Sequence, residues 1–186
     1  MAEEEVKNAE TQEQAPEGEE AKPAASGEKV PLPKRIIGSF IDGIIAAIAQ
    51  MVVTLVLTIV HGAIGAAAGA AVAAGYWLLR DSILGNGQSI GKKAMGYQVV
   101  GPDGKPYPQE LSIKRNIPLA LGSIVGIVTG LAGLIPFLGF LVAMAGTLVG
   151  FVTLAIVVAE IYFIHSDEDG NRWGDKFAGT TTKLIG

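Results

Sequence analysis

Cysteine is absent from this sequence of 186 residues, and histidine occurs only twice. Without cysteine the chain can form neither disulfides nor thiolate metal sites. It also has no pair of histidines at metal-ligand spacing and no serine–histidine–acid set that one site could bring together. We therefore expect no bound metal, no cofactor and no enzymatic activity, although a two-carboxylate site made by Asp42 and Glu160 stays open.

Charge is also scarce, because Asp, Glu, Lys and Arg make up only 17% of the chain. Hydrophobic residues make up 49%, and the mean hydropathy is +0.42, which is high for a soluble domain of this size. The N-terminus lacks the basic segment and short apolar run of a secretory signal peptide. The first long apolar segment is therefore expected to be an uncleaved membrane-targeting element.

Large apolar side chains are nearly absent from residues 1–33, which hold nine Glu and three Lys. Such a segment cannot bury enough surface to offset its ordering entropy, so we predict a disordered acidic tail. It is either a solvated tail, the favoured interpretation, or an arm that docks a cytoplasmic protein partner. The acidic net charge of −4 comes from this tail, and we expect no nucleic-acid partner.

Long apolar runs dominate the remaining residues, 34–186. Helices are predicted near residues 35–60, 62–80, 115–134 and 138–165, each long enough to cross a bilayer core. The last two come from one apolar block of about 48 residues, which the Gly133–Gly139 segment GLIPFLG divides, because Pro136 between glycines favours a turn. The predicted fold class is all-α transmembrane, a four-helix membrane bundle.

Glycines recur at intervals of four residues in three of the predicted helices. This spacing lets helix backbones approach closely, so it predicts tight packing inside the bundle, with a homo-oligomer contact as the alternative. The residues concerned are Gly65, Gly69, Gly122, Gly126, Gly130, Gly146 and Gly150.

Lysine and arginine are missing from the two predicted turns near His61 and Pro136. All of them lie in the tail, at the start of the first helix, in the loop 81–114 with its flanking arginines, or near the C-terminus. The positive-inside rule then predicts a multi-pass protein of the cell inner membrane, with both termini and the loop in the cytoplasm. A β-hairpin is expected in this loop, with MGYQVV as one strand, Pro102–Gly104 as the turn and Lys105–Pro108 as the return strand. Residues 166–186 form a C-terminal cytoplasmic segment.

A few polar residues interrupt the apolar helices. At 100° per residue, Arg35, Asp42 and Gln50 share one face of the first helix, and Glu160 occupies the fourth. A carboxylate inside a membrane helix usually faces a protein interior or a hydrated cavity. The favoured interpretation is an ion-pair cluster of these acids with arginines that fixes helix register. The alternative is a cation-binding or proton-relay site built on Asp42.

Four segments in order resemble the RDD family of prokaryotic membrane proteins: KRIIGSFID, QSIGKKAMGYQVVGPDGK, Arg115 and NRWGDKFAGTTTKLI. The resemblance covers about residues 34–184. It implies that Arg35 is the family arginine and Asp42 the first family aspartate. Asp175 is then the favoured second aspartate, with Asp81 as the alternative.

The family resemblance also implies an undefined molecular role, with cation/proton exchange as one activity linked to some members. Fold and family alone do not settle function. The competing hypothesis is a non-transporting membrane scaffold or interaction module that acts through its cytoplasmic tail and loop.

Overall fold

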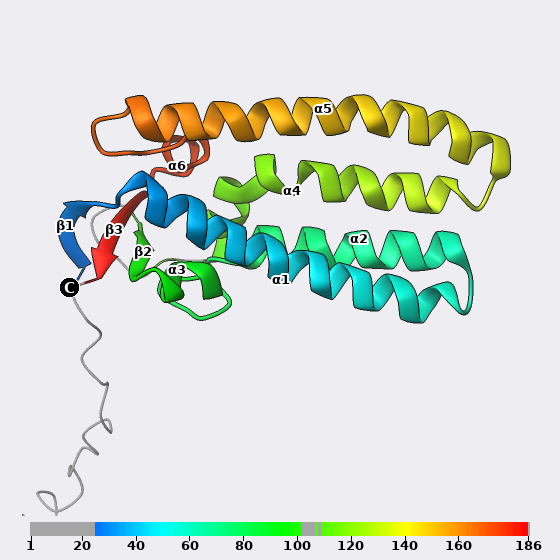
Figure 1. Ribbon diagram of the computed structural model, residues 1–186, viewed down its shortest axis with the longest axis horizontal. Helices are drawn as coiled ribbons and strands as arrows, with labels where there is room; N and C mark the ends of the chain where they lie inside the picture. Colours follow the sequence, from blue (N-terminus) through cyan, green and yellow to red (C-terminus); the bar gives the residue numbers. More distant parts are fainter. Residues whose placement is uncertain (1–24, 102–106, 108, 186) are drawn as a thin grey trace, which may run out of the picture.

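The computed structural model describes residues 25–101, 107 and 109–185, and it contains four helices long and apolar enough to cross a membrane. They are α1 (Leu32–Thr58), α2 (Gly62–Leu79), α4 (Gln109–Ala132) and α5 (Pro136–Ser166). The predicted four-helix membrane bundle is thus confirmed (Figure 1). The third of these helices begins six residues before the predicted residue 115, because the polar residues from Gln109 onward continue the helix.

The four helices pack in sequence order, α1 on α2, α2 on α4 and α4 on α5. Short turns join α1 to α2 and α4 to α5 at one end of the bundle (Figure 1). Pro136 occupies the first turn of α5, where its missing N–H costs no helix hydrogen bond. Many large apolar side chains of α1 and α5 are exposed on the bundle surface, as expected for helices that face lipid.

The smaller elements gather at the other end of the bundle, and together we call them the cap (Figure 1). The cap comprises α3 (Ile90–Ala94), α6 (Trp173–Ala178), β1 (Ala25–Lys29), β2 (Tyr97–Val100) and β3 (Thr181–Ile185). The strands form an antiparallel sheet in the order β1-β3-β2, with Tyr97 opposite Leu184 and Val100 opposite Thr181.

This sheet contains two features that the sequence did not predict. The strand of the loop, β2, pairs with the C-terminal strand β3. The expected return strand at 105–108 lies outside the described residues, except for Tyr107, which lies in no strand. Residues 25–29 form β1 instead of continuing the predicted disordered tail, because β3 offers them a pairing edge. The predicted disorder of residues 1–24 lies outside the described residues.

Most of the predicted glycines lie where helices approach each other. A Cβ on Gly65 or Gly69 of α2 would come within 2.8 Å of an α1 carbonyl oxygen, that of Thr54 or Gln50. On α4, a Cβ on Gly130 would lie 2.5 Å from the nitrogen of Ala67.

The other members of the glycine series differ in their surroundings. Gly126 faces Ala70 of α2, and Gly122 faces Thr153 of α5 in ordinary contact. Gly146 of α5 faces Thr129 of α4, whereas nothing lies within 4 Å of a Cβ placed on Gly150. The series therefore marks close helix packing along α2 and α4, and it ends before Gly150.

Candidate functional site

The most polar region of the interior lies where the four long helices meet the cap. We call it the charge cluster, and its charged members are each at least 95% buried. They are Arg35, Asp42, Arg80, Asp81, Lys92, Arg115, Arg172 and Asp175. No single helix or connecting segment supplies more than two of them, so the cluster exists only when the elements are assembled.

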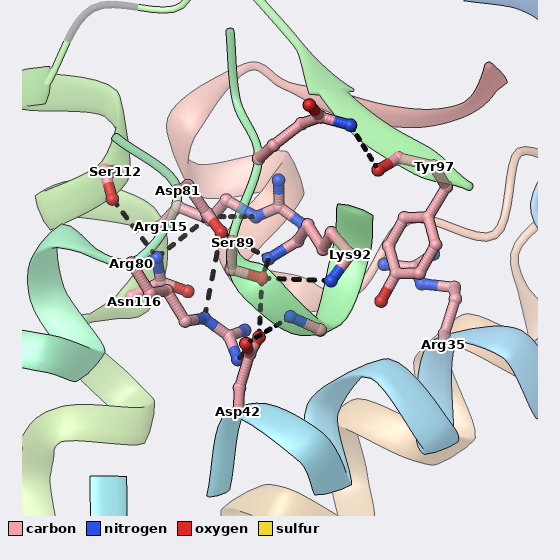
Figure 2. A network of polar contacts seen from close by, with 12 residues as sticks. Arg35, Asp42, Arg80, Asp81, Ser89, Lys92, Tyr97, Ser112, Arg115 and Asn116 are labelled. Carbon is pink, nitrogen blue, oxygen red and sulfur yellow. Dashed lines mark hydrogen bonds and ion pairs between the residues drawn. The ribbon is translucent and has the colours of Figure 1, made fainter. Parts of the chain in front are cut away.

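Asp42 of α1 is completely buried and surrounded by hydrogen-bond donors (Figure 2). Its Oδ1 accepts from the Tyr76 hydroxyl at 2.9 Å and the Gly91 N–H at 2.8 Å. Its Oδ2 accepts from the Ser89 hydroxyl at 2.6 Å and Arg80 Nη1 at 3.3 Å. A carboxylate offers about four lone-pair sites, so Asp42 has no free acceptor position in this arrangement.

Gly91 explains how α3 comes so close to Asp42. A Cβ at this position would overlap the carbonyl oxygen of Gly38 on α1, so only glycine lets the two backbones meet here. The Ser89 hydroxyl also caps α3 by accepting from the Lys92 N–H. The segment QSIGK thus places one side-chain donor and one backbone donor on Asp42.

Asp81 follows α2 and is also completely buried. It forms an ion pair with Lys92 and accepts from the Asn116 amide at 2.9 Å (Figure 2). Arg115 Nε lies 3.7 Å from Asp81 Oδ2, and Arg80 Nε lies 3.8 Å from Oδ1. Asp81 therefore ties the end of α2 to α3 and to the start of α4.

Asp175 of α6 is the third fully buried aspartate. It forms ion pairs with Arg35 Nη2 at 2.9 Å, Arg115 Nε at 2.7 Å and Arg172 Nε at 2.9 Å. Its carboxylate also accepts from the Arg172 N–H at 3.2 Å in a capping box at the start of α6. Asp175 holds the C-terminal segment on α1 and α4.

The geometry just described can be compared with known proteins. Residues 30–179 match the family model described as the RDD family. The chain belongs to the RDD family. Comparison with curated proteins and with solved structures gives no match.

The RDD match spans α1 to α6 and so contains the whole charge cluster. Arg35, the implied family arginine, binds Asp175 and the Gly170 carbonyl oxygen rather than Asp42. Asp81 and Asp175, the two alternatives for the second aspartate, are both buried and both form ion pairs with Arg115. The arginine and all three aspartates of this RDD chain thus belong to one connected network.

Two predicted site residues have other surroundings. Gln50 is exposed on α1 and lines a different cavity with Thr54, Thr129 and the small residues of α2 and α4. Glu160 is buried, and its Oε1 accepts from the Gly174 N–H at 3.2 Å. Among the described residues its Oε2 has no hydrogen-bond partner, and Glu160 forms no ion pair. The expected ion pair between Glu160 and an arginine is therefore not formed among the described residues.

Two members of the cluster were not predicted as site residues. Lys92 lies in the polar loop segment SIGKK, and Asn116 lies at the start of an apolar run, where a polar residue is expected as a simple helix end. One feature of the sequence could have indicated these contacts. The polar pairs Arg80–Asp81 and Arg115–Asn116 both lie at helix ends that the positive-inside rule places on the same side of the membrane. Which of these polar residues pair depends on which helix ends lie close together in space, and the sequence does not show this.

Burial and the neighbouring charges of the cluster shift the pKa values of the charged side chains outside the spans. Burial would raise the pKa of Asp81, but Lys92, Arg115 and Arg80 outweigh it and hold this pKa well below its usual range. Arg115, Arg172 and Arg35 likewise overcome burial and hold the pKa of Asp175 low. Burial lowers the pKa of Lys92 to about 7, with Arg80 adding to this effect and Asp81 opposing it.

Cations outnumber anions in and around the charge cluster, with five Lys and Arg against three Asp and the neighbouring Glu160 by formal charge. No group of three or more His, Cys, Asp or Glu suited to a metal ion occurs in residues 25–101, 107 and 109–185. The arrangement is chemically suited to holding helices together and to binding an anion, since its carboxylates are already occupied by donors.

Proposed function

We propose that this RDD protein is a non-transporting membrane interaction module, in which four membrane helices hold a folded cap at one membrane face. The observation that carries the proposal is the saturation of Asp42 by four donors. A transported cation would need oxygen lone pairs at this site, and it would have to approach five buried cationic side chains.

The two ends of the bundle support a role for the cap. One end consists of short turns, whereas the other carries a three-stranded sheet, two short helices and the attachment point of the acidic tail (Figure 1). All described lysines and arginines lie at the cap end, which supports an inner-membrane protein with a cytoplasmic cap and cytoplasmic termini. The cap would then present its surface to cytoplasmic proteins.

Single-cysteine labelling tests this orientation, because the chain has no native cysteine. Lys93→Cys places an exposed thiol on α3, and Val60→Cys places one in the α1–α2 turn. In intact cells we expect a membrane-impermeant maleimide to label Val60→Cys and to label Lys93→Cys only after the cells are opened. The reverse labelling pattern would refute the cytoplasmic cap.

A second candidate function is cation/proton exchange through Glu160. One observation favours it: Glu160 Oε2 is buried without a hydrogen-bond partner among the described residues, and Glu160 lines a cavity. Acidic residues inside membrane helices commonly mark ion or proton pathways.

Measurement of proton flux in proteoliposomes distinguishes the two candidate functions. Vesicles containing the purified full chain and a pH-sensitive dye receive a sodium or potassium gradient. An interaction module gives no proton flux beyond that of protein-free vesicles. Flux that disappears in Glu160→Gln, while the variant retains wild-type thermal stability, would replace the proposal with the exchanger.

A further inference from the structure

A cavity of about 370 Å³ lies beside the charge cluster and has two chemically different walls. The polar wall contains all five cations of the cluster: Arg35, Arg80, Lys92, Arg115 and Arg172. The apolar wall is formed by Ile36, Phe40, Trp77, Leu119, Val157, Ile161 and Ile164. A ligand that fills this cavity must itself have a charged end and an apolar end.

The apolar wall is open to the membrane. α1 and α5 are the two ends of the packing series α1, α2, α4, α5, and both contribute to this wall. Their lining residues Ile36, Phe40 and Ile161 are 46%, 68% and 40% exposed, and they lie on spans that face lipid. The cavity can therefore be entered from the bilayer between α1 and α5.

The polar wall has unused capacity for an anion. Arg80 Nε and Arg115 Nη1 are buried and donate no hydrogen bond in the described part of the chain, and Arg80 Nε only approaches Asp81 Oδ1 at 3.8 Å. The five cations also outnumber the four buried acids around them, which are the three cluster aspartates and Glu160. A buried cation that lacks enough neighbouring negative charge destabilises the folded protein. An anion bound against the polar wall would therefore be stabilised by these cations.

We propose that the cavity binds a membrane amphiphile with a phosphate headgroup, whose acyl chains leave between α1 and α5. The phosphate would accept from the arginines of the polar wall, as in basic pockets between membrane helices that hold anionic lipid headgroups. The volume lies near the lower limit for small-molecule pockets, so it fits a headgroup and the first part of the chains.

Glu160 narrows the choice of headgroup. Its Oε2 is buried at the same cavity and needs a donor. A headgroup that carries hydroxyl groups beside its phosphate satisfies both the arginines and this carboxylate oxygen. Phosphatidylglycerol has both groups, whereas the quaternary ammonium of phosphatidylcholine offers no N–H or O–H donor.

Quenching of Trp77 by brominated lipid measures this binding, because Trp77 lines the cavity. The Trp173→Phe variant of the full chain leaves Trp77 as the single tryptophan and changes a side chain outside the cavity. The protein is placed in phosphatidylcholine vesicles that contain increasing fractions of brominated phosphatidylglycerol or of brominated phosphatidylcholine. We expect phosphatidylglycerol to bind about tenfold more strongly, the difference that one charge-assisted hydrogen bond produces.

Adjacent residues of α5 provide a matched control. Val157 lines the cavity, whereas Val158 is exposed and does not line it. Val157→Phe should fill the cavity and abolish the preference, and Val158→Phe should retain it. Ser39→Phe fills the same cavity from α1 and replaces Val157→Phe if that variant does not fold.

Three results would overturn the proposal. Equal quenching by the two lipids would show that the cavity does not select a headgroup. A preference that persists in both cavity-filling variants would show that anionic lipid gathers at the cap surface by charge alone. Full relief of phosphatidylglycerol quenching by micromolar glycerol phosphate would show that the polar wall prefers a soluble phosphate to a lipid.

Discussion

Replacing Asp175 by asparagine tests whether the charge cluster holds the bundle and the cap together. Asparagine has nearly the same size as aspartate, so the substitution removes charge without opening a cavity. Three buried arginines lose their ion pair with this carboxylate, at 2.7–2.9 Å in the native structure. The capping box of α6 also loses its charged acceptor.

Removing one partner from a buried ion pair typically costs about 3–5 kcal/mol, because the remaining charge stays buried. For a chain of this length, 1 kcal/mol corresponds to roughly 2–4 °C, so Asp175→Asn should lower the apparent Tm by about 6–20 °C. The measurement is thermal unfolding of the purified full chain in detergent, followed by tryptophan fluorescence. Both proteins are heated at one scan rate, since unfolding of a membrane protein can be irreversible.

Asp167→Asn provides the matched control in the same C-terminal segment. Asp167 pairs with Lys176, whose side chain is 55% exposed, so this ion pair is worth at most about 1 kcal/mol. The apparent Tm of the control should fall by no more than about 4 °C. If the two variants lose stability equally, burial does not explain how much the charges of the cluster contribute to stability.

Two further predictions concern packing and pH. Gly130→Ala should destabilise the bundle by about 1–3 kcal/mol, because its Cβ would press on the α2 backbone. Gly150→Ala, in open space, should leave the apparent Tm unchanged or raised; equal losses in the two variants would contradict the packing assignment. Because Asp81 and Asp175 have lowered pKa values, their stabilisation is present above the unfolded pKa of about 4 and is lost as pH falls below it. The apparent Tm should therefore fall steeply below pH 4, and less steeply in Asp175→Asn; an acid profile identical in both proteins would refute this linkage.

The sequence by itself determined the membrane helices and the turns between them. A run of eighteen or more apolar residues must satisfy its backbone hydrogen bonds internally in lipid, and the α-helix does so with local contacts alone. Pro136 similarly divides α4 from α5 through a local restriction on the chain. These features depend on neighbours along the chain, and they could be predicted without a structure.

Only the tertiary structure decided which distant residues pair. Arg35 and Asp175 are 140 positions apart, and Asp42 takes its donors from α2 and from the segment before and within α3. β2 likewise pairs with β3, which lies far from it along the chain. The periodicity of α1 showed which way Asp42 points, but its partners depend on how the cap folds onto the helix ends. Buried charges accept whichever opposite charges the assembled fold brings near, and that choice is set by long-range packing rather than by local sequence.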